Sequence, residues 1–145
     1  MKITDFGLAK DCYEKDVYVK KSDTPLPIKW MSIESLRDNI FTTKSDVWSF
    51  GILLWELFTL AGNPYPGVQI DAEFYIKLRN GYRMLKPEYC CDEIYSIMLN
   101  CWNNEPEKRP DFNQLSDQFF KCLSVTNQDY YLKLEFTYQW FSLFK

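Results

Sequence analysis

The sequence predicts a mainly α-helical domain, and two observations carry this prediction. The first is an apolar run at residues 43–60, which is long enough for one helix and includes the acidic side chains Asp46 and Glu56. The second is that three later segments repeat apolar residues at helical spacing, with no low-complexity linker between them. A chain of 145 residues is also long enough for a domain with a real hydrophobic core.

Residues 43–60 are predicted to form the central helix of this domain. Thr43 can cap the amino end, and Asp46 completes a capping-box-like pair near the positive end of the helix dipole. Gly62 is available to end the helix. The run is apolar on nearly every side but shorter than the roughly 20 apolar residues of a membrane span, so we expect a buried core helix. Gly51 costs about 1 kcal/mol relative to Ala inside a helix, which predicts a close neighbour there.

Three further helices are predicted from apolar residues at helical spacing, over residues 71–80, 92–102 and 111–123. Gly81 is placed to end the first of them. The apolar faces consist of Phe74 and Leu78 in the first, of Ile94, Ile97, Met98, Cys101 and Trp102 in the second, and of Phe112, Leu115, Phe119 and Leu123 in the third. We interpret each face as core packed on the central helix, with a cofactor site as the less favoured alternative. The large side chains expected to be buried are Trp48, Leu53, Trp55 and Trp102.

Composition excludes several kinds of chemistry. The sequence contains no histidine, which removes histidine-based acid–base catalysis, the serine–histidine triad, and most zinc and haem sites. The net charge of −3 combines both signs, so there is no electrostatic basis for binding nucleic acid or an anionic membrane surface. The five cysteines include no Cys-x-x-Cys pair, and we interpret them as reduced intracellular thiols. Asp5 and Asp11 leave no room for the apolar core of a signal peptide.

A set of short motifs follows in a fixed order along the chain. The tripeptide Asp5-Phe6-Gly7, after a strand-like run at residues 1–4, is a weak signal by itself. The motifs after it are Leu26-Pro27-Ile28-Lys29-Trp30, Ser32-Ile33-Glu34, Ser45-Asp46-Val47-Trp48-Ser49-Phe50-Gly51, Pro64-Tyr65-Pro66-Gly67, Gly81-Tyr82-Arg83-Met84, Cys101-Trp102 and Lys108-Arg109-Pro110. Over about residues 2–124 they resemble the second half of a receptor tyrosine kinase catalytic domain. The resemblance is greatest to fibroblast, vascular endothelial and platelet-derived growth factor receptors, and to Torso-like receptors.

This resemblance implies the C-terminal lobe of a protein-kinase-like fold at residues 1–124, lacking the N-terminal lobe and the catalytic loop, with an uncertain tail at residues 125–145. It also implies the function: transfer of the γ-phosphate of ATP to protein tyrosine in growth-factor signalling, at the cytoplasmic side of the plasma membrane. Only four residues precede Asp5, so the glycine-rich loop, the phosphate-pairing lysine and the catalytic aspartate are expected to be missing. We therefore expect the isolated chain to retain no catalytic residue and to be inactive, with ATP and Mg²⁺ serving the complete domain.

The resemblance assigns roles to residues near the start of the chain. Asp5 matches the aspartate that binds Mg²⁺. Tyr13 and Tyr18 lie in the implied activation loop, where phosphorylation adds about −1.5 to −2 charges that can pair with nearby lysines. We expect Tyr18, close to Lys20, to be the main switch and Tyr13, near acidic residues, to be secondary; ordinary surface tyrosines are the alternative. Lys10 replaces the arginine that often binds the phosphotyrosine.

A substrate platform is implied by the resemblance at Leu26, Pro27, Ile28, Lys29 and Trp30. The proline fixes the backbone and gives a rigid apolar shelf suited to a long aromatic acceptor. Serine/threonine kinases usually have a different sequence here, so the resemblance implies specificity for tyrosine. Glu34 and Arg109 match a buried ion pair that ties the loop to the late helices, although Ser32-Ile33-Glu34 replaces the family's Ala-Pro-Glu. Asp46 matches the residue that braces the catalytic-loop backbone. All three of these charged residues are structural, not catalytic.

The tail carries one further motif. Residues 127–134 resemble a segment of fibroblast growth factor receptors in which phosphotyrosine recruits a signalling partner; Tyr131 is the matching tyrosine, and Lys133 replaces an acidic residue. Residues 135–145 fit either a strand or a helix. The implied partners are protein tyrosine substrates and phosphotyrosine-reading adaptors, with no nucleic acid and no membrane segment in this chain. The rival hypothesis is a truncated, soluble, cytoplasmic docking module without catalytic activity, and the coding sequence upstream of Met1 would separate the two.

Overall fold

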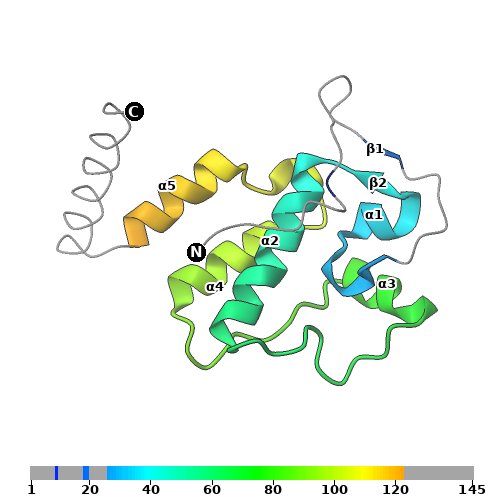
Figure 1. Cartoon of the computed structure of the whole chain (residues 1–145), viewed down its shortest axis with the longest axis horizontal. Coiled ribbons are helices and arrows are strands. Elements are labelled where there is room, and N and C mark those ends of the chain that lie inside the picture. Colours follow the sequence, from blue (N-terminus) through cyan, green and yellow to red (C-terminus); the bar gives the residue numbers. More distant parts are fainter. Residues whose placement is uncertain (1–8, 10–17, 20–25, 123–145) are drawn as a thin grey trace, which may run out of the picture. The chain divides into compact units, whose positions relative to one another are not determined.

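The computed structural model describes residue 9, residues 18–19 and residues 26–122 (Figure 1). The chain divides into two compact units, Met1–Asp111 and Phe112–Lys145. The described elements of the first unit are β1 (Tyr18–Val19), the 3₁₀ turn η1 (Ile28–Trp30), α1 (Ile33–Asp38), β2 (Ile40–Phe41), α2 (Thr43–Phe58), α3 (Ala72–Arg79), α4 (Asp92–Cys101) and the 3₁₀ turn η2 (Pro106–Lys108). The second unit contributes α5 (Phe112–Cys122). The described residues are therefore mainly helical, as the sequence predicts.

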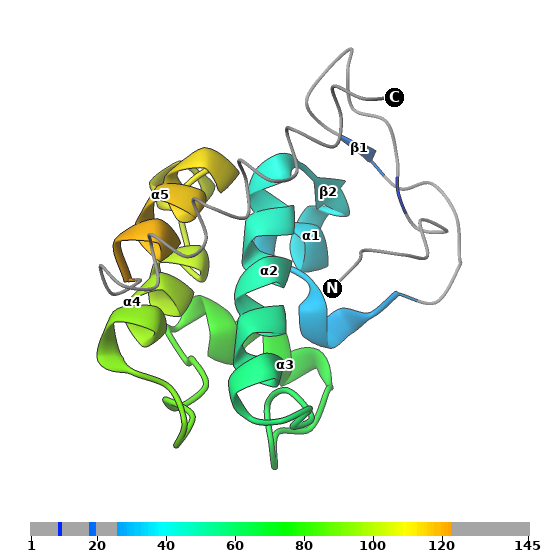
Figure 2. The ribbon, with the colours of Figure 1, turned by 60° about the vertical axis from the view of Figure 1, so that its left-hand side comes forward.

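Helix α2 runs through the first unit, and α4 packs along it (Figures 1 and 2). The α4 face predicted from periodicity is buried; it consists of Ile94, Ile97, Met98, Cys101 and the adjoining Trp102. On α2, Trp48 and Trp55 are buried as predicted, but Leu53 is 48% exposed. Leu57, one turn later, is 46% exposed, so both leucines lie on a face of α2 that is open in the described part of the chain. The prediction for Leu53 is wrong because an apolar sequence does not reveal which helix face a neighbour covers.

The cap at the amino end of α2 lies one residue earlier than predicted. Thr42 is the N-cap, and its Oγ1 accepts hydrogen bonds from the N–H groups of Lys44 (3.2 Å) and Ser45 (3.3 Å). The Ser45 hydroxyl accepts from the Thr42 N–H at 2.7 Å and completes a capping box. The predicted box of Thr43 and Asp46 is wrong, because Thr43 is already the first helical residue. Two consecutive threonines, each with an acceptor three residues later, make the two registers indistinguishable in the sequence.

The carboxyl end of α2 also differs from the prediction. The helix ends at Phe58, before Gly62 is reached. Leu60 (φ 55°) and Ala61 (φ 70°) take the left-handed conformation, and their N–H groups donate to carbonyls of the last turn at 3.2 and 2.8 Å. These backbone hydrogen bonds offset the cost of a conformation that non-glycine residues ordinarily avoid. Gly62 permits a close approach instead: a Cβ there would lie 2.6 Å from the Thr59 Oγ1.

Gly51 of α2 lies against the carboxyl end of α4. A Cβ at Gly51 would come within 2.6 Å of the Trp102 Nε1 and 2.8 Å of the Cys101 Cβ, which confirms the predicted close neighbour. Gly51→Ala should therefore lower the free energy of unfolding by about 1–3 kcal/mol, because overpacking outweighs the ~1 kcal/mol by which alanine favours a helix. Urea unfolding followed by tryptophan fluorescence measures this change. The exposed control Leu53→Ala should cost less, and a Gly51→Ala variant as stable as the parent would contradict the packing described.

Short elements that the sequence did not predict precede α2. In α1, the Ser32 hydroxyl accepts from the Ser35 N–H at 3.4 Å as an N-cap, and Asn39 follows the helix in the left-handed conformation (φ 54°). Strand β2 pairs antiparallel with β1, with Tyr18 opposite Phe41. These elements place residues 18–19 next to the segment that leads into the cap of α2.

Helix α3 agrees with its prediction and packs beside α1. Phe74 and Leu78 are buried. Gly81 is left-handed (φ 92°), its N–H donates to the Leu78 carbonyl at 3.0 Å, and the next N–H, of Tyr82, donates to the Lys77 carbonyl at 3.0 Å. This pair of bonds is a Schellman motif, so Gly81 ends the helix as the sequence predicts.

Helix α5 forms where the sequence predicts it, and its apolar face is buried in part. Leu115 is buried, Phe112 is 46% exposed, and Leu123 lies outside the described residues. Packing of this face on the central helix stays a prediction. Among the helices of the described residues, none combines the length and apolar character that crossing a membrane requires.

Candidate functional site

The segment from Leu26 to Trp30 forms a tight, internally hydrogen-bonded turn. Pro27 (φ −75°, ψ 74°) lies at the centre of an inverse γ-turn, closed by the Ile28 N–H donating to the Leu26 carbonyl at 2.9 Å. The turn η1 follows, with the Trp30 N–H donating to the Pro27 carbonyl at 2.9 Å and the Met31 N–H to the Ile28 carbonyl at 3.2 Å. Because proline also fixes φ, this backbone forms a rigid shelf.

The side chains of this turn divide into two groups. Pro27 and Ile28 are exposed, whereas Leu26, Lys29 and Trp30 are half-buried. The Lys29 Nζ donates to the Asn63 Oδ1 at 2.8 Å and to the Pro64 carbonyl at 2.9 Å. The exposed residues can meet a ligand, whereas Lys29 is engaged with the protein.

Trp30 is attached to α2 at two points. Its indole Nε1 donates to the Glu56 Oε2 at 2.9 Å. Its backbone carbonyl accepts from the Ser49 hydroxyl at 2.8 Å. Sequence analysis did not single out Ser49 or Glu56 for this role, because nothing local to either residue indicates a partner 19 or 26 positions away.

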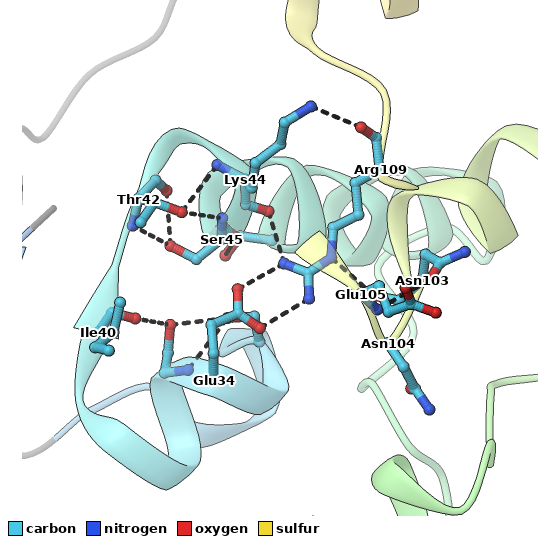
Figure 3. Close-up of polar contacts among 12 residues, drawn as sticks. Glu34, Ile40, Thr42, Lys44, Ser45, Asn103, Asn104, Glu105 and Arg109 are labelled. Atoms are coloured by element: carbon cyan, nitrogen blue, oxygen red, sulfur yellow. Dashed lines mark hydrogen bonds and ion pairs between the residues drawn. The ribbon is translucent and has the colours of Figure 1, made fainter. Parts of the chain in front are cut away.

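An ion pair lies between α1 and the segment after α4 (Figure 3). The Arg109 Nη1 and Nη2 bind the Glu34 carboxylate oxygens at 2.6 and 2.8 Å, in a bidentate arrangement. The Arg109 guanidinium also donates to the backbone carbonyls of Asn103 and Lys44, both at 2.9 Å, and the Lys44 Nζ donates to the Arg109 carbonyl at 2.7 Å. The structure thus brings Glu34 and Arg109 together as a pair that joins α1, α2 and the segment after α4.

Burial and charge act in opposite directions on Glu34. The Arg109 side chain is fully buried and the Glu34 side chain is 13% exposed. Burial alone would raise the pKa of the Glu34 carboxyl, but the hydrogen bonds and the positive charge of Arg109 outweigh it and hold that pKa below its ordinary value. Glu34 is therefore ionised at neutral pH, as a bidentate partner of arginine has to be.

A second arginine supports the same region, and sequence analysis assigned no role to it. The Arg83 guanidinium lies over the Trp48 ring at 4.8 Å from its centroid, as that of Arg109 does at 5.1 Å. Arg83 also donates to the Trp102 and Leu78 carbonyls, each at 2.8 Å. It therefore links the ends of α3 and α4 to Trp48 of α2. The only sequence signal was its place in the Gly81–Met84 motif.

Asp46 lies in the first turn of α2, and its side chain is exposed. Neighbouring protein removes water from part of the carboxylate and raises its pKa. The backbone N–H of Asp46 donates to the Thr42 carbonyl at 3.1 Å, and in the described part of the chain the Asp46 carboxylate forms no hydrogen bond or ion pair. The carboxylate is thus accessible to a donor from elsewhere.

Of the implied phosphorylation sites, the structure describes Tyr18 alone. Its side chain is half-buried, and its ring lies 6.1 Å from the ring of Phe41, centroid to centroid, across the β1–β2 pair. Asp5, Tyr13 and Tyr131 lie outside the described residues. Within those described residues no three cysteine, aspartate or glutamate side chains gather as a metal site.

Comparison with known proteins decides the family. Residues 1–119 match the family described as protein tyrosine and serine/threonine kinases. The chain belongs to this family. Its recognition as the C-lobe segment of a receptor tyrosine kinase, and the mainly α fold class, are confirmed.

Growth-factor receptors are among the similar proteins. Platelet-derived growth factor receptor alpha is 59% identical in Xenopus laevis and 57% identical in Homo sapiens, each over 117 residues, 81% of this chain and 11% of the receptor. Vascular endothelial growth factor receptor 1 of Homo sapiens is 54% identical over 128 residues, 88% of this chain and 10% of the receptor. The kinase segment thus spans about a tenth of the length of these relatives.

Proposed function

We propose that this chain supplies the activation loop and the substrate platform of a receptor protein-tyrosine kinase, which transfers the γ-phosphate of ATP to protein tyrosine in growth-factor signalling at the cytoplasmic side of the plasma membrane. The observation that carries the proposal is the rigid turn at Leu26–Trp30, with Pro27 and Ile28 exposed at its surface. The growth-factor receptors among its relatives support the receptor assignment.

The described residues contribute to phosphoryl transfer by positioning the acceptor. The reaction needs an aligned acceptor and neutralised charge more than covalent chemistry. A shelf whose backbone is fixed by Pro27 and by its own hydrogen bonds loses little freedom when an acceptor segment lies on it. The ion pair of Glu34 and Arg109 holds the chain just beyond the shelf against α2. The described residues thus orient the acceptor without reacting.

ATP and Mg²⁺ belong to the complete domain in this proposal. Mg²⁺ would neutralise charge on the transferred phosphate, and Asp5 is the residue proposed to hold it. Asp5 lies outside the described residues. Asp46, accessible at the start of α2, is proposed to accept hydrogen bonds from the backbone of the catalytic loop. The 145-residue chain alone is proposed to be inactive.

A chimaera tests this function. Residues 1–119 would replace the matching segment of human platelet-derived growth factor receptor alpha, whose 57% identity makes the exchange practicable. The chimaera should phosphorylate a glutamate–tyrosine copolymer, and Asp5→Ala should lower kcat by at least about a hundredfold because the Mg²⁺ ligand is lost. The 145-residue chain should show no turnover in the same assay. A folded chimaera without activity would favour the docking module, with Tyr131 as the proposed site for a phosphotyrosine-reading adaptor.

Regulation by the activation loop is proposed to depend mainly on Tyr18. Tyr18 of β1 pairs with Phe41 of β2, which directly precedes the cap of α2. A phosphate on Tyr18 would therefore change the pairing of β1 with β2, and it could also form ion pairs with nearby lysines. Tyr13 lies beside Glu14 and two residues from Asp11, where added negative charge gains less. After autophosphorylation of the chimaera, Tyr18→Phe should lower kcat/KM more than Tyr13→Phe does. The reverse order would show that the two sites are ranked wrongly.

A further inference from the structure

We propose that Glu56, Ser49 and Asn63 are positioning residues for the tyrosine-bearing substrate. They hold Lys29 and Trp30, and thereby fix the shelf whose exposed surface is Pro27 and Ile28. This inference rests on the proposed function and deepens it. These three side chains fix the position and orientation of the Leu26–Trp30 turn relative to the rest of the first unit.

The first anchor joins Trp30 to α2. The Glu56 carboxylate accepts from the indole N–H at 2.9 Å, and the Ser49 hydroxyl donates to the backbone carbonyl of the same tryptophan at 2.8 Å. Ser49 and Glu56 are seven residues apart, two helical turns, so they lie on the same face of α2. One residue of the shelf is therefore held at its side chain and at its backbone by a single rigid helix.

The second anchor joins Lys29 to the segment that follows α2. The Lys29 ammonium contacts the Asn63 side chain at 2.8 Å and the Pro64 carbonyl at 2.9 Å. Pro64 is fully buried, and Tyr65 after it is 2% exposed and left-handed (φ 54°), so this point of attachment is itself fixed. Two consecutive residues of the shelf are therefore held by different segments: Lys29 by the segment after α2, and Trp30 by α2 itself.

These contacts leave the shelf's outer residues free for a ligand. Lys29 and Trp30 use their polar groups on the protein, whereas Pro27 and Ile28 have apolar side chains that are exposed. An apolar, pre-ordered surface suits the aliphatic and aromatic parts of a peptide around a tyrosine. A loosened anchor should leave the acceptor less well bound and less well aligned, so kcat/KM for the peptide should fall while KM for ATP should not change.

The first arm of the test uses the 145-residue chain. Amide hydrogen exchange at Trp30 and Met31 should become about tenfold faster in Glu56→Ala, because one charge-assisted hydrogen bond is lost. Glu56→Gln, which keeps an acceptor oxygen, should restore most of the protection. In a Trp30→Phe background, Glu56→Ala should have no further effect, since the donor is already gone. The control Glu73→Ala, on the exposed first turn of α3, should match the parent. An unchanged exchange rate in Glu56→Ala would overturn the anchor.

The second arm uses the chimaera with the receptor's remaining kinase domain. Glu56→Ala should lower kcat/KM for a tyrosine peptide about tenfold, with KM for ATP within about twofold of the parent, and Glu56→Gln should rescue kcat/KM. An unchanged kcat/KM for the peptide, or no rescue by Glu56→Gln, would overturn the positioning role even if the exchange result holds. An inactive parent chimaera would overturn the proposed function instead, while hydrogen exchange still decides whether the anchor exists.

Discussion

Glu34→Gln should lower the free energy of unfolding by about 3–5 kcal/mol at pH 7, the effect expected when one partner of a buried ion pair is removed. Arg109 is fully buried, and its charge would be left without a counter-charge. Urea unfolding measures the loss. The exposed pair of Arg37 and Asp38 offers a matched control, because Asp38→Asn also removes a carboxylate bound to arginine. That variant should unfold at nearly the parent's urea midpoint, since exposed pairs contribute little.

The same pair gives the unfolding curve a defined pH dependence. The folded-state pKa of Glu34 lies below its ordinary value, so the fold binds fewer protons there than the unfolded chain does. The stabilisation is therefore fully present above the unfolded pKa of about 4.3 and is lost as pH falls through the lower folded value. The stability difference between the parent and Glu34→Gln should shrink below about pH 4. A difference that stays constant down to pH 3 would contradict the coupling of Glu34 to Arg109.

Trp55→Ala should cost about 3–5 kcal/mol, as expected for a large-to-small change in the core. Trp55 is buried in α2, and its indole N–H donates to the Leu85 carbonyl at 2.9 Å, so the variant loses packing and a hydrogen bond together. Trp55→Phe keeps most of the ring and should cost considerably less. Leu57→Ala, two residues later on the exposed face, is the control in the same urea assay. Equal losses in Trp55→Ala and Leu57→Ala would contradict the orientation of α2.

Element length decided how much of the fold could be predicted. The face of α4 has three turns of apolar periodicity, and each of its predicted residues is buried. Helix α1 has six residues, too few for a period, although Ser32 and Asn39 carry cap signals at its two ends. Leu60 and Ala61 could not be predicted as left-handed, because neither is a glycine. Hydrogen bonds to the last turn of α2 hold them in this conformation.

The candidate site divides along similar lines. Resemblance to a known family pointed to Glu34, Arg109 and the shelf at Leu26–Trp30, which recur as sequence motifs. It did not point to Glu56 or Asn63, because each meets the shelf across 26 or more residues through a single side-chain contact. Such partners follow only from tertiary structure. They are also the residues whose substitution separates positioning of the substrate from stability of the fold.

We propose that this chain forms the tyrosine-selective platform of a protein kinase. Transfer of labelled γ-phosphate by the chimaera to two peptides that differ in a single residue, tyrosine or serine, tests it most directly. We expect label on the tyrosine peptide and at least about a hundredfold lower kcat/KM for the serine peptide, whose short side chain cannot reach the same point from the shelf. Equal transfer to both peptides by an active chimaera would contradict it.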